Sequence, residues 1–135
     1  MAQAFHYLYV EDDPGSRDVM RTLLIDLAKV GHLDIFESSA NFLARLKSLP
    51  QQPDFIFLDI NILPEDGYQV IAQIRSDPDL EGISVLAVTA GVIANQIEKM
   101  KQAGFNGALS KPIDVSRFVQ TIRRLESGQP VWQVS

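Results

Sequence analysis

The sequence contains no cysteine, so disulfide bonds, zinc–thiolate sites and thiol catalysis are all excluded. It also lacks an excess of positive charge, because 17 acidic residues against 12 lysines and arginines give a net charge of −5. Without a basic patch to neutralise phosphates, we expect no nucleic-acid partner. No apolar run is long enough to span a membrane, and the N-terminus lacks the pattern of a signal peptide. We therefore expect a cytoplasmic protein with no membrane partner.

What the chain does contain is a regular alternation of short β-rich runs with segments of helical apolar spacing. The predicted strands are residues 5–10, 33–37, 55–59, 83–90 and 107–110. The predicted helices are residues 16–30, 38–49 with a serine cap, 67–76, 93–104 and 115–125. Such alternation predicts an α/β protein, a doubly wound five-stranded parallel sheet with five helices on its two faces.

A single domain accounts for nearly the whole chain of 135 residues. We assign residues 1–127 to this domain and residues 128–135 to a C-terminal tail, because the tail shows no periodic pattern. Its Trp132 is expected to be disordered or loosely packed, and docking on a partner groove or on the domain itself stays open as the alternative. His6 and His32 are interpreted as structural or surface residues.

Polar side chains follow four of the predicted strands at the point where each strand ends. They are Glu11, Asp12, Asp13, Asp59, Thr89 and Lys111. Taken singly, each is an ordinary loop, cap or surface residue. Together they lie at the carboxyl ends of parallel strands, which is where open α/β sheets bind ligands.

These residue types suit one chemistry. Converging carboxylates repel each other unless a cation joins them, and oxygen-only ligands suit Mg²⁺. Asp59 could attack a phosphoryl group as a nucleophile and form an aspartyl phosphate. The metal and Lys111 would neutralise the charge of the group in transfer, and the Thr89 hydroxyl could bond to it.

Four motifs carry a family resemblance: VEDD at 10–13, LDIN at 58–61 followed by Gly67, VTA at 88–90 and SKP at 110–112. With them, residues 5–127 resemble the receiver domain of a two-component response regulator. The resemblance implies a flavodoxin-like receiver fold with strand order 2-1-3-4-5.

The resemblance also implies a role for each matching residue. Asp59 would be the phosphorylated residue, with Thr89 as the switch hydroxyl and Lys111 as the phosphate-pairing lysine. The implied Mg²⁺ ligands are Glu11, Asp12, Asp59 and the backbone carbonyl of Asn61. The Lys111–Pro112 bond is expected to be cis. Asp13 is expected to cap the first helix rather than to bind metal.

The implied function is that of a stand-alone phosphorelay regulator of the chemotaxis type. Its donor would be a sensor histidine kinase or a histidine phosphotransfer protein, and its output would be contact with a downstream protein target. It would not be an enzyme beyond its own phosphoryl transfer and hydrolysis. Two alternatives stay open: a magnesium-dependent phosphotransferase or phosphatase of similar layout, and a receiver that docks without being phosphorylated.

Two positions depart from the family pattern. Leu63 stands where the family usually has proline, and Pro64 follows one residue later. Ala108 stands where the family usually has the tyrosine or phenylalanine that moves on activation. Without that ring, we expect the loop 90–95 to carry the change, with Gly91 as a hinge. The alternative is that the activated face changes little and that partners bind the phosphoryl site and its loop directly.

Overall fold

Six parallel strands form one sheet in the order β2-β1-β3-β4-β5-β6. The computed structural model describes residues 4–91 and 94–133. The strands are β1 His6–Val10, β2 His32–Phe36, β3 Phe55–Leu58, β4 Ser84–Ala90, β5 Gly107–Lys111 and β6 Val131–Trp132. The first five confirm the predicted doubly wound order, and the short sixth was not predicted.

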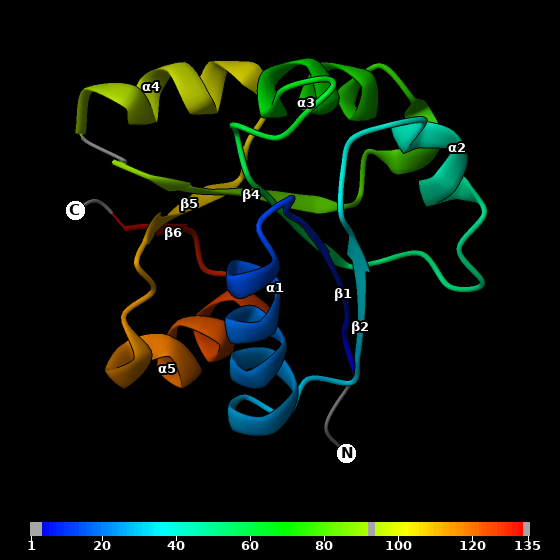
Figure 1. Cartoon of the computed structure of the whole chain (residues 1–135). Coiled ribbons are helices and arrows are strands. Elements are labelled where there is room, and N and C mark those ends of the chain that lie inside the picture. The colour runs from blue at the N-terminus through cyan, green and yellow to red at the C-terminus, as the bar shows by residue number, and fades with distance from the viewer. Residues whose placement is uncertain (1–3, 92–93, 134–135) are drawn as a thin grey trace.

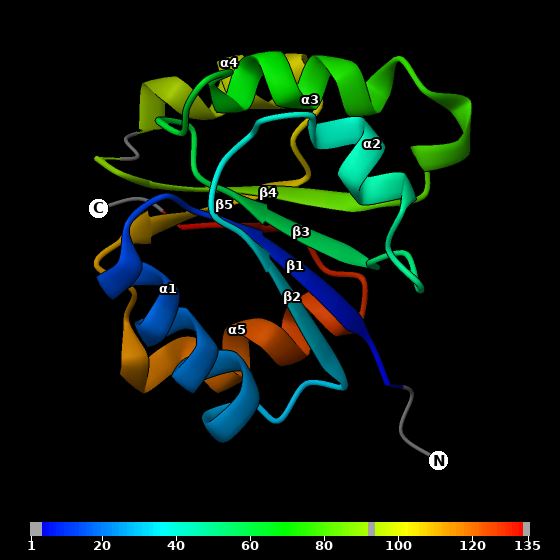
Figure 2. The ribbon, with the colours of Figure 1, turned by 45° about the vertical axis from the view of Figure 1, so that its right-hand side comes forward.

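Helices cover both faces of the sheet (Figure 1). On one face lie α2 Phe42–Lys47, α3 Gly67–Arg75 and α4 Ala94–Ala103, and on the other lie α1 Pro14–Arg21 and α5 Val115–Glu126. A π-helical turn, η1 Thr22–Leu27, extends α1, and a 3₁₀ turn, η2 Pro78–Leu80, follows α3. Figure 2 shows the same two layers from a second direction. In the described part of the chain, no helix has the length and apolar character needed to cross a membrane.

The two faces of the sheet bury separate apolar clusters. Along β1, Leu8 and Val10 pack toward the α2–α4 layer, whereas Tyr7 and Tyr9 pack toward α1 and α5. This alternation follows from the two-residue period of a strand. All four residues of β3, Phe55–Leu58, are buried because helices cover both sides of the central strand.

Aspartates begin three of the helices as side-chain caps. Asp13 caps α1 as predicted, with Oδ2 accepting from the Ser16 amide at 2.8 Å. Asp66 and Asp114 cap α3 and α5. The serine cap predicted for the second helix is wrong: α2 begins after Asn41, which makes no side-chain cap bond. Ser39 instead bonds the backbone of Glu65, and so ties the loop after β2 to the loop after β3.

In the described part of the tail, residues 128–133, Trp132 is not loosely packed, which corrects the first expectation for it and agrees with the alternative that it docks on the domain itself. Val131 and Trp132 pair with β5 as β6, in register with Gly107 and Ala108. Val131 is buried, and Trp132 packs against the α2–α4 side core. The tail lacked periodicity because two strand residues are too few to show one.

The loop that follows β4 lies partly beyond the described residues. Gly91 adopts a positive φ of 75°, as its predicted conformational freedom allows. Residues 92 and 93, which belong to the proposed hinge 90–95, lie outside the described residues. The hinge therefore stays a prediction.

Candidate functional site

The carboxyl ends of β1 and β3 bring three acidic residues together. Glu11, Asp12 and Asp59 each offer a carboxylate oxygen, and these oxygens lie within 4.8 Å of one another. Glu11 and Asp59 are buried and Asp12 is exposed. The strands position them because neighbouring parallel strands end at the same edge of the sheet.

Lys111, the last residue of β5, joins two of these carboxylates. Its ammonium donates a hydrogen bond to Asp59 Oδ2 at 2.9 Å and another to Glu11 Oε1. The peptide bond that follows it, Lys111–Pro112, is cis as expected, and so is Leu63–Pro64. One lysine charge therefore faces two buried carboxylates and a third at the surface.

The other oxygen of Asp59 is held by the loop that follows it. The Asn61 amide N–H donates to Asp59 Oδ1 at 2.9 Å, and the Asn61 side chain donates to Thr89 Oγ1 at 3.3 Å. Thr89 is buried at the end of β4. Asn61 therefore links the strand-end aspartate to the strand-end threonine.

Burial is the dominant influence on the pKa values of the site. Burial is the largest cause that raises the pKa of Asp59, and Glu11 raises it further. The bonds from Asn61 and Lys111 lower that pKa without cancelling the rise. Burial also opposes the charge on Lys111, but its bonds to Glu11 and Asp59 outweigh burial and raise the pKa of the ammonium. The lysine thus stays charged, and the carboxylates still gain from a further cation.

The donor set fits Mg²⁺. Its side-chain ligands are carboxylate oxygens, and hard divalent cations prefer such oxygens. The exposed position of Asp12 leaves the cluster open to solvent, which suits an ion that retains part of its water shell. The cluster also places three carboxylates beside one lysine ammonium, so a further cation would reduce their mutual repulsion.

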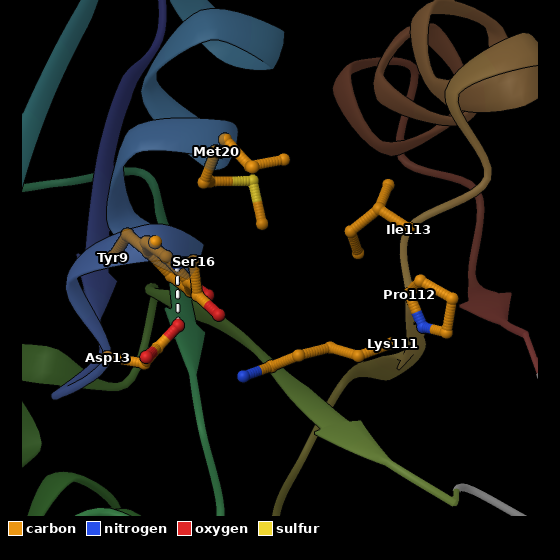
Figure 3. A pocket seen from close by; sticks show the side chains of 9 residues that line it. Tyr9, Asp13, Ser16, Met20, Lys111, Pro112 and Ile113 are labelled. Atoms are coloured by element: carbon orange, nitrogen blue, oxygen red, sulfur yellow. Dashed lines mark hydrogen bonds between the residues drawn. The ribbon is translucent and has the colours of Figure 1, made fainter.

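Two hollows flank this edge of the sheet. One, of about 370 Å³, lies between α1 and the segment after β5 and is lined in part by Val19, Met20, Lys111 and Ile113. Figure 3 shows Lys111 reaching across this hollow toward the side that carries Asp13. The second, of about 360 Å³, lies beside α4 and includes Asn61 and Thr89 in its lining.

The residues predicted to form the site all lie at this edge of the sheet: Glu11, Asp12, Asp59, Asn61, Thr89 and Lys111. Asn61 also donates two hydrogen bonds that were not predicted. Tyr9 was not predicted to belong to the site, yet its hydroxyl donates to Glu11 Oε1 at 2.8 Å. A usable signal existed: Tyr9 and Glu11 are two residues apart at a strand end, so their side chains project from the same face.

A doubly wound parallel sheet, with an acid cluster, a threonine and a lysine at its carboxyl edge, defines the class of this protein. The model of the response regulator receiver domain matches residues 7–123. The chain therefore belongs to the response regulator receiver family, whose members are signalling modules of two-component systems.

Two curated relatives differ in how much of their own length this chain matches. It is 30% identical over 128 residues to signal transduction histidine-protein kinase BarA of Escherichia coli, a match that covers 95% of this chain but 14% of BarA. It is 29% identical over 116 residues to polar-differentiation response regulator DivK of Brucella ovis, which covers 86% of this chain and 91% of DivK.

Solved structures agree with the fold. Chemotaxis response regulator CheY4 of Vibrio cholerae superposes with a TM-score of 0.79 at 20% identity, over 91% of this chain and 99% of CheY4. The phosphorylated cyanobacterial phytochrome response regulator RcpA gives a TM-score of 0.76 at 22% identity, over 93% of each chain. At these identities the likeness establishes the fold alone.

Proposed function

We propose that this receiver domain accepts a phosphoryl group on Asp59 in a Mg²⁺-dependent reaction. The donor is the phosphohistidine of a sensor histidine kinase or of a histidine phosphotransfer protein. The observation that carries the proposal is the contact between Lys111 Nζ and Asp59 Oδ2, beside the acid cluster. The aspartyl phosphate then biases the surface that the domain presents to a downstream protein target.

The chain's own groups divide the work of the transfer. A carboxylate oxygen of Asp59 attacks phosphorus, the new O–P bond forms, and the P–N bond to the donor imidazole breaks with its electron pair going to the imidazole. Lys111, already on Asp59, stays beside the oxygens of the arriving group. Thr89 exchanges its bond from Asn61 for one to a phosphoryl oxygen.

Glu11, Asp12 and Asp59 would hold Mg²⁺, together with the backbone carbonyl of Asn61. When bound, the ion would neutralise charge on the carboxylates and on the phosphoryl oxygens. This role fits a cluster in which three carboxylates share one lysine ammonium.

The hollow next to Lys111 suits the donor protein. Met20 and Ile113 give it an apolar lining, and Val19 beside them is 54% exposed. An apolar helix face of the donor could pack there and bring its phosphohistidine to Asp59. The similarity to DivK, which is named a response regulator, supports a regulatory output for the phosphorylated domain.

In this proposal the protein changes only its own phosphorylation state, so it is not a turnover enzyme. A phosphatase or phosphotransferase of similar layout needs an acid near the nucleophile, and two residues after Asp59 that place is taken by Asn61. A receiver that only docks would have no use for a lysine held against a buried aspartate.

The test is mass spectrometry of the full chain after incubation with Mg²⁺ and acetyl phosphate. We expect a gain of one phosphoryl group that depends on Mg²⁺ and disappears in Asp59→Asn. Asp54→Asn, which alters an aspartate just before β3, is the control and should be labelled like the wild type. Labelling of Asp59→Asn at the wild-type rate would place the modification elsewhere.

A further inference from the structure

Tyr9, in strand β1, is hydrogen-bonded to a member of the acid cluster. Its hydroxyl donates to Glu11 Oε1 at 2.8 Å, and both side chains are 1% exposed. The two residues lie two apart at the end of β1, so they project from the same face of the strand. A buried carboxylate needs such a donor, because an unpaired one is costly.

The donors to Glu11 are distributed unevenly between its two oxygens. Oε1 accepts from both the Tyr9 hydroxyl and the Lys111 ammonium. Oε2 accepts from the Asp13 amide at 3.3 Å, which is a long and therefore weak bond. Oε2 therefore has the weaker donor of the two oxygens and is the one more available to a cation.

Among the residues that the structure describes, Lys111 bonds to both Glu11 and Asp59, whereas the Tyr9 hydroxyl bonds to Glu11 alone. In the proposed transfer, Lys111 must leave Glu11 to follow the phosphoryl oxygens on Asp59. Glu11 would then lose one of its Oε1 donors while it stays buried. The Tyr9 hydroxyl would remain on that oxygen throughout, so the carboxylate is never left without a partner.

We propose that Tyr9 is a positioning residue of the acid site: its hydroxyl orients Glu11 toward the metal and releases Lys111 for the phosphoryl group. The proposal rests on the proposed function, since it concerns the same metal and the same transfer. Without the hydroxyl, Lys111 and Glu11 pair more closely, and the metal must compete with the lysine for the carboxylate.

The strand supplies a matched control in Tyr7. It lies on the same face of β1, is also 1% exposed, and donates to a glutamate, Glu126 Oε2, at 2.7 Å. Tyr7→Phe and Tyr9→Phe therefore each delete one buried hydroxyl bonded to a carboxylate. Only Tyr9 contacts the acid cluster.

The first measurement is Mg²⁺ binding to the full chain by calorimetric titration. We expect Tyr9→Phe to raise the dissociation constant about tenfold, as is common when a partner of a metal ligand is lost. Tyr7→Phe should bind like the wild type, although both variants lose stability. Wild-type affinity in Tyr9→Phe, or tighter binding, would overturn the proposal.

A double-mutant cycle shows whether Tyr9 acts through Glu11. In a Glu11→Ala background, Tyr9→Phe should leave the Mg²⁺ affinity unchanged; a further tenfold loss there would contradict the mechanism. The second readout is the rate of labelling by acetyl phosphate at saturating Mg²⁺, which should fall in Tyr9→Phe and not in Tyr7→Phe.

The measurements distinguish an error in the role of Tyr9 from an error in the proposed function. If the wild type binds Mg²⁺ and is labelled on Asp59, while Tyr9→Phe matches it in both, only the role of Tyr9 is wrong. If the wild type neither binds Mg²⁺ nor is labelled, the proposed function is wrong, and the positioning role falls with it.

Discussion

Nζ of Lys111 lies 2.9 Å from Oδ2 of Asp59, and the same ammonium also donates to Glu11. The three residues come from the ends of three different strands, and this one lysine keeps two buried carboxylates from facing each other unopposed. The stability of the metal-free protein is therefore tied to the groups that we propose to carry the chemistry.

Lys111→Ala should destabilise the metal-free protein. Removing one member of a buried ion pair leaves an uncompensated charge, and here it leaves two. Because the Lys111 side chain is 23% exposed, water moderates the loss, and we expect about 2 kcal/mol in the free energy of unfolding by urea. Millimolar Mg²⁺ should recover part of it, since the ion opposes the same carboxylates.

The control for this variant is Lys47→Ala. It breaks an ion pair with Asp77 at the surface, away from the acid cluster. Its unfolding should change little, and Mg²⁺ should not alter the difference from the wild type. Equal effects of Mg²⁺ on both lysine variants would show that the ion does not act at this site.

Asp59→Asn should stabilise the metal-free protein at neutral pH. Burial raises the pKa of Asp59 in the folded state above its ordinary value of about 3.9. As pH rises, the unfolded chain therefore loses this proton at a lower pH than the folded protein does. The contribution of Asp59 to the free energy of unfolding is fully present below about pH 4 and is lost as pH rises through the pKa of the folded state. Asp59→Asn has no carboxyl group to titrate, so this loss does not occur in the variant. Urea unfolding at several pH values should give the variant a higher free energy of unfolding than the wild type at pH 7 and not at pH 4.

Asp13→Asn is a control with the opposite sign. The hydrogen bonds from Ser16 lower the pKa of Asp13, so its contribution is present above the ordinary aspartate pKa and lost as pH falls. Asparagine can still cap α1. An Asp59→Asn profile that moves with pH in the same direction as that of Asp13→Asn would contradict the electrostatics described here.

Mg²⁺ should raise the melting temperature of the wild type. A ligand that binds only the folded state stabilises it by mass action, by about 2.7 kcal/mol at a concentration of 100 times its dissociation constant. Asp12→Ala should lose most of this gain, because it removes one carboxylate of the cluster. Without metal the same variant should be at least as stable as the wild type, since a repelling charge is gone.

Asp18→Ala tests whether that loss is specific. Asp18 is an exposed aspartate of α1 that lies outside the cluster. Differential scanning fluorimetry with and without Mg²⁺ should give it the wild-type response. A wild-type melting temperature that ignores millimolar Mg²⁺ would count against the metal site itself.

Much of this arrangement could be predicted because it depends on local patterns repeated along the chain. The central strands β3 and β4 are apolar runs, and the polar residues that follow the strands meet at one edge whatever the details of packing. Residues such as Asp59 and Lys111 were therefore predictable from position alone.

The features that escaped prediction depend on contacts between distant segments. β6 is two residues long, and it forms because β5 offers an edge beside Gly107 rather than because of its own sequence. The bond from Asn61 to Thr89 joins residues 28 positions apart. Ser39 caps no helix because the loop at Glu65 takes its hydroxyl.

The tail strand gives the last prediction. A Cβ atom added at Gly107 would lie 2.4 Å from the backbone oxygen of Val131, closer than real Cβ contacts allow. The clash is with backbone, so no side-chain rotation relieves it. Gly107→Ala should therefore detach β6 from β5, together with the bond from the Gln133 amide to the Ala108 carbonyl.

Trp132 reports this detachment, because it is the only tryptophan in the chain. Its ring packs against the core on the α4 side, with Lys101 Nζ 5.3 Å from the ring centroid. In Gly107→Ala we expect a red shift of its emission and a loss of about 1–3 kcal/mol in unfolding free energy. Gly82→Ala, where nothing lies within 4 Å of the added atom, should change neither. If Gly107→Ala keeps the emission of the wild type, the prediction is wrong, and the position of Trp132 does not depend on the close approach between Gly107 and the Val131 backbone.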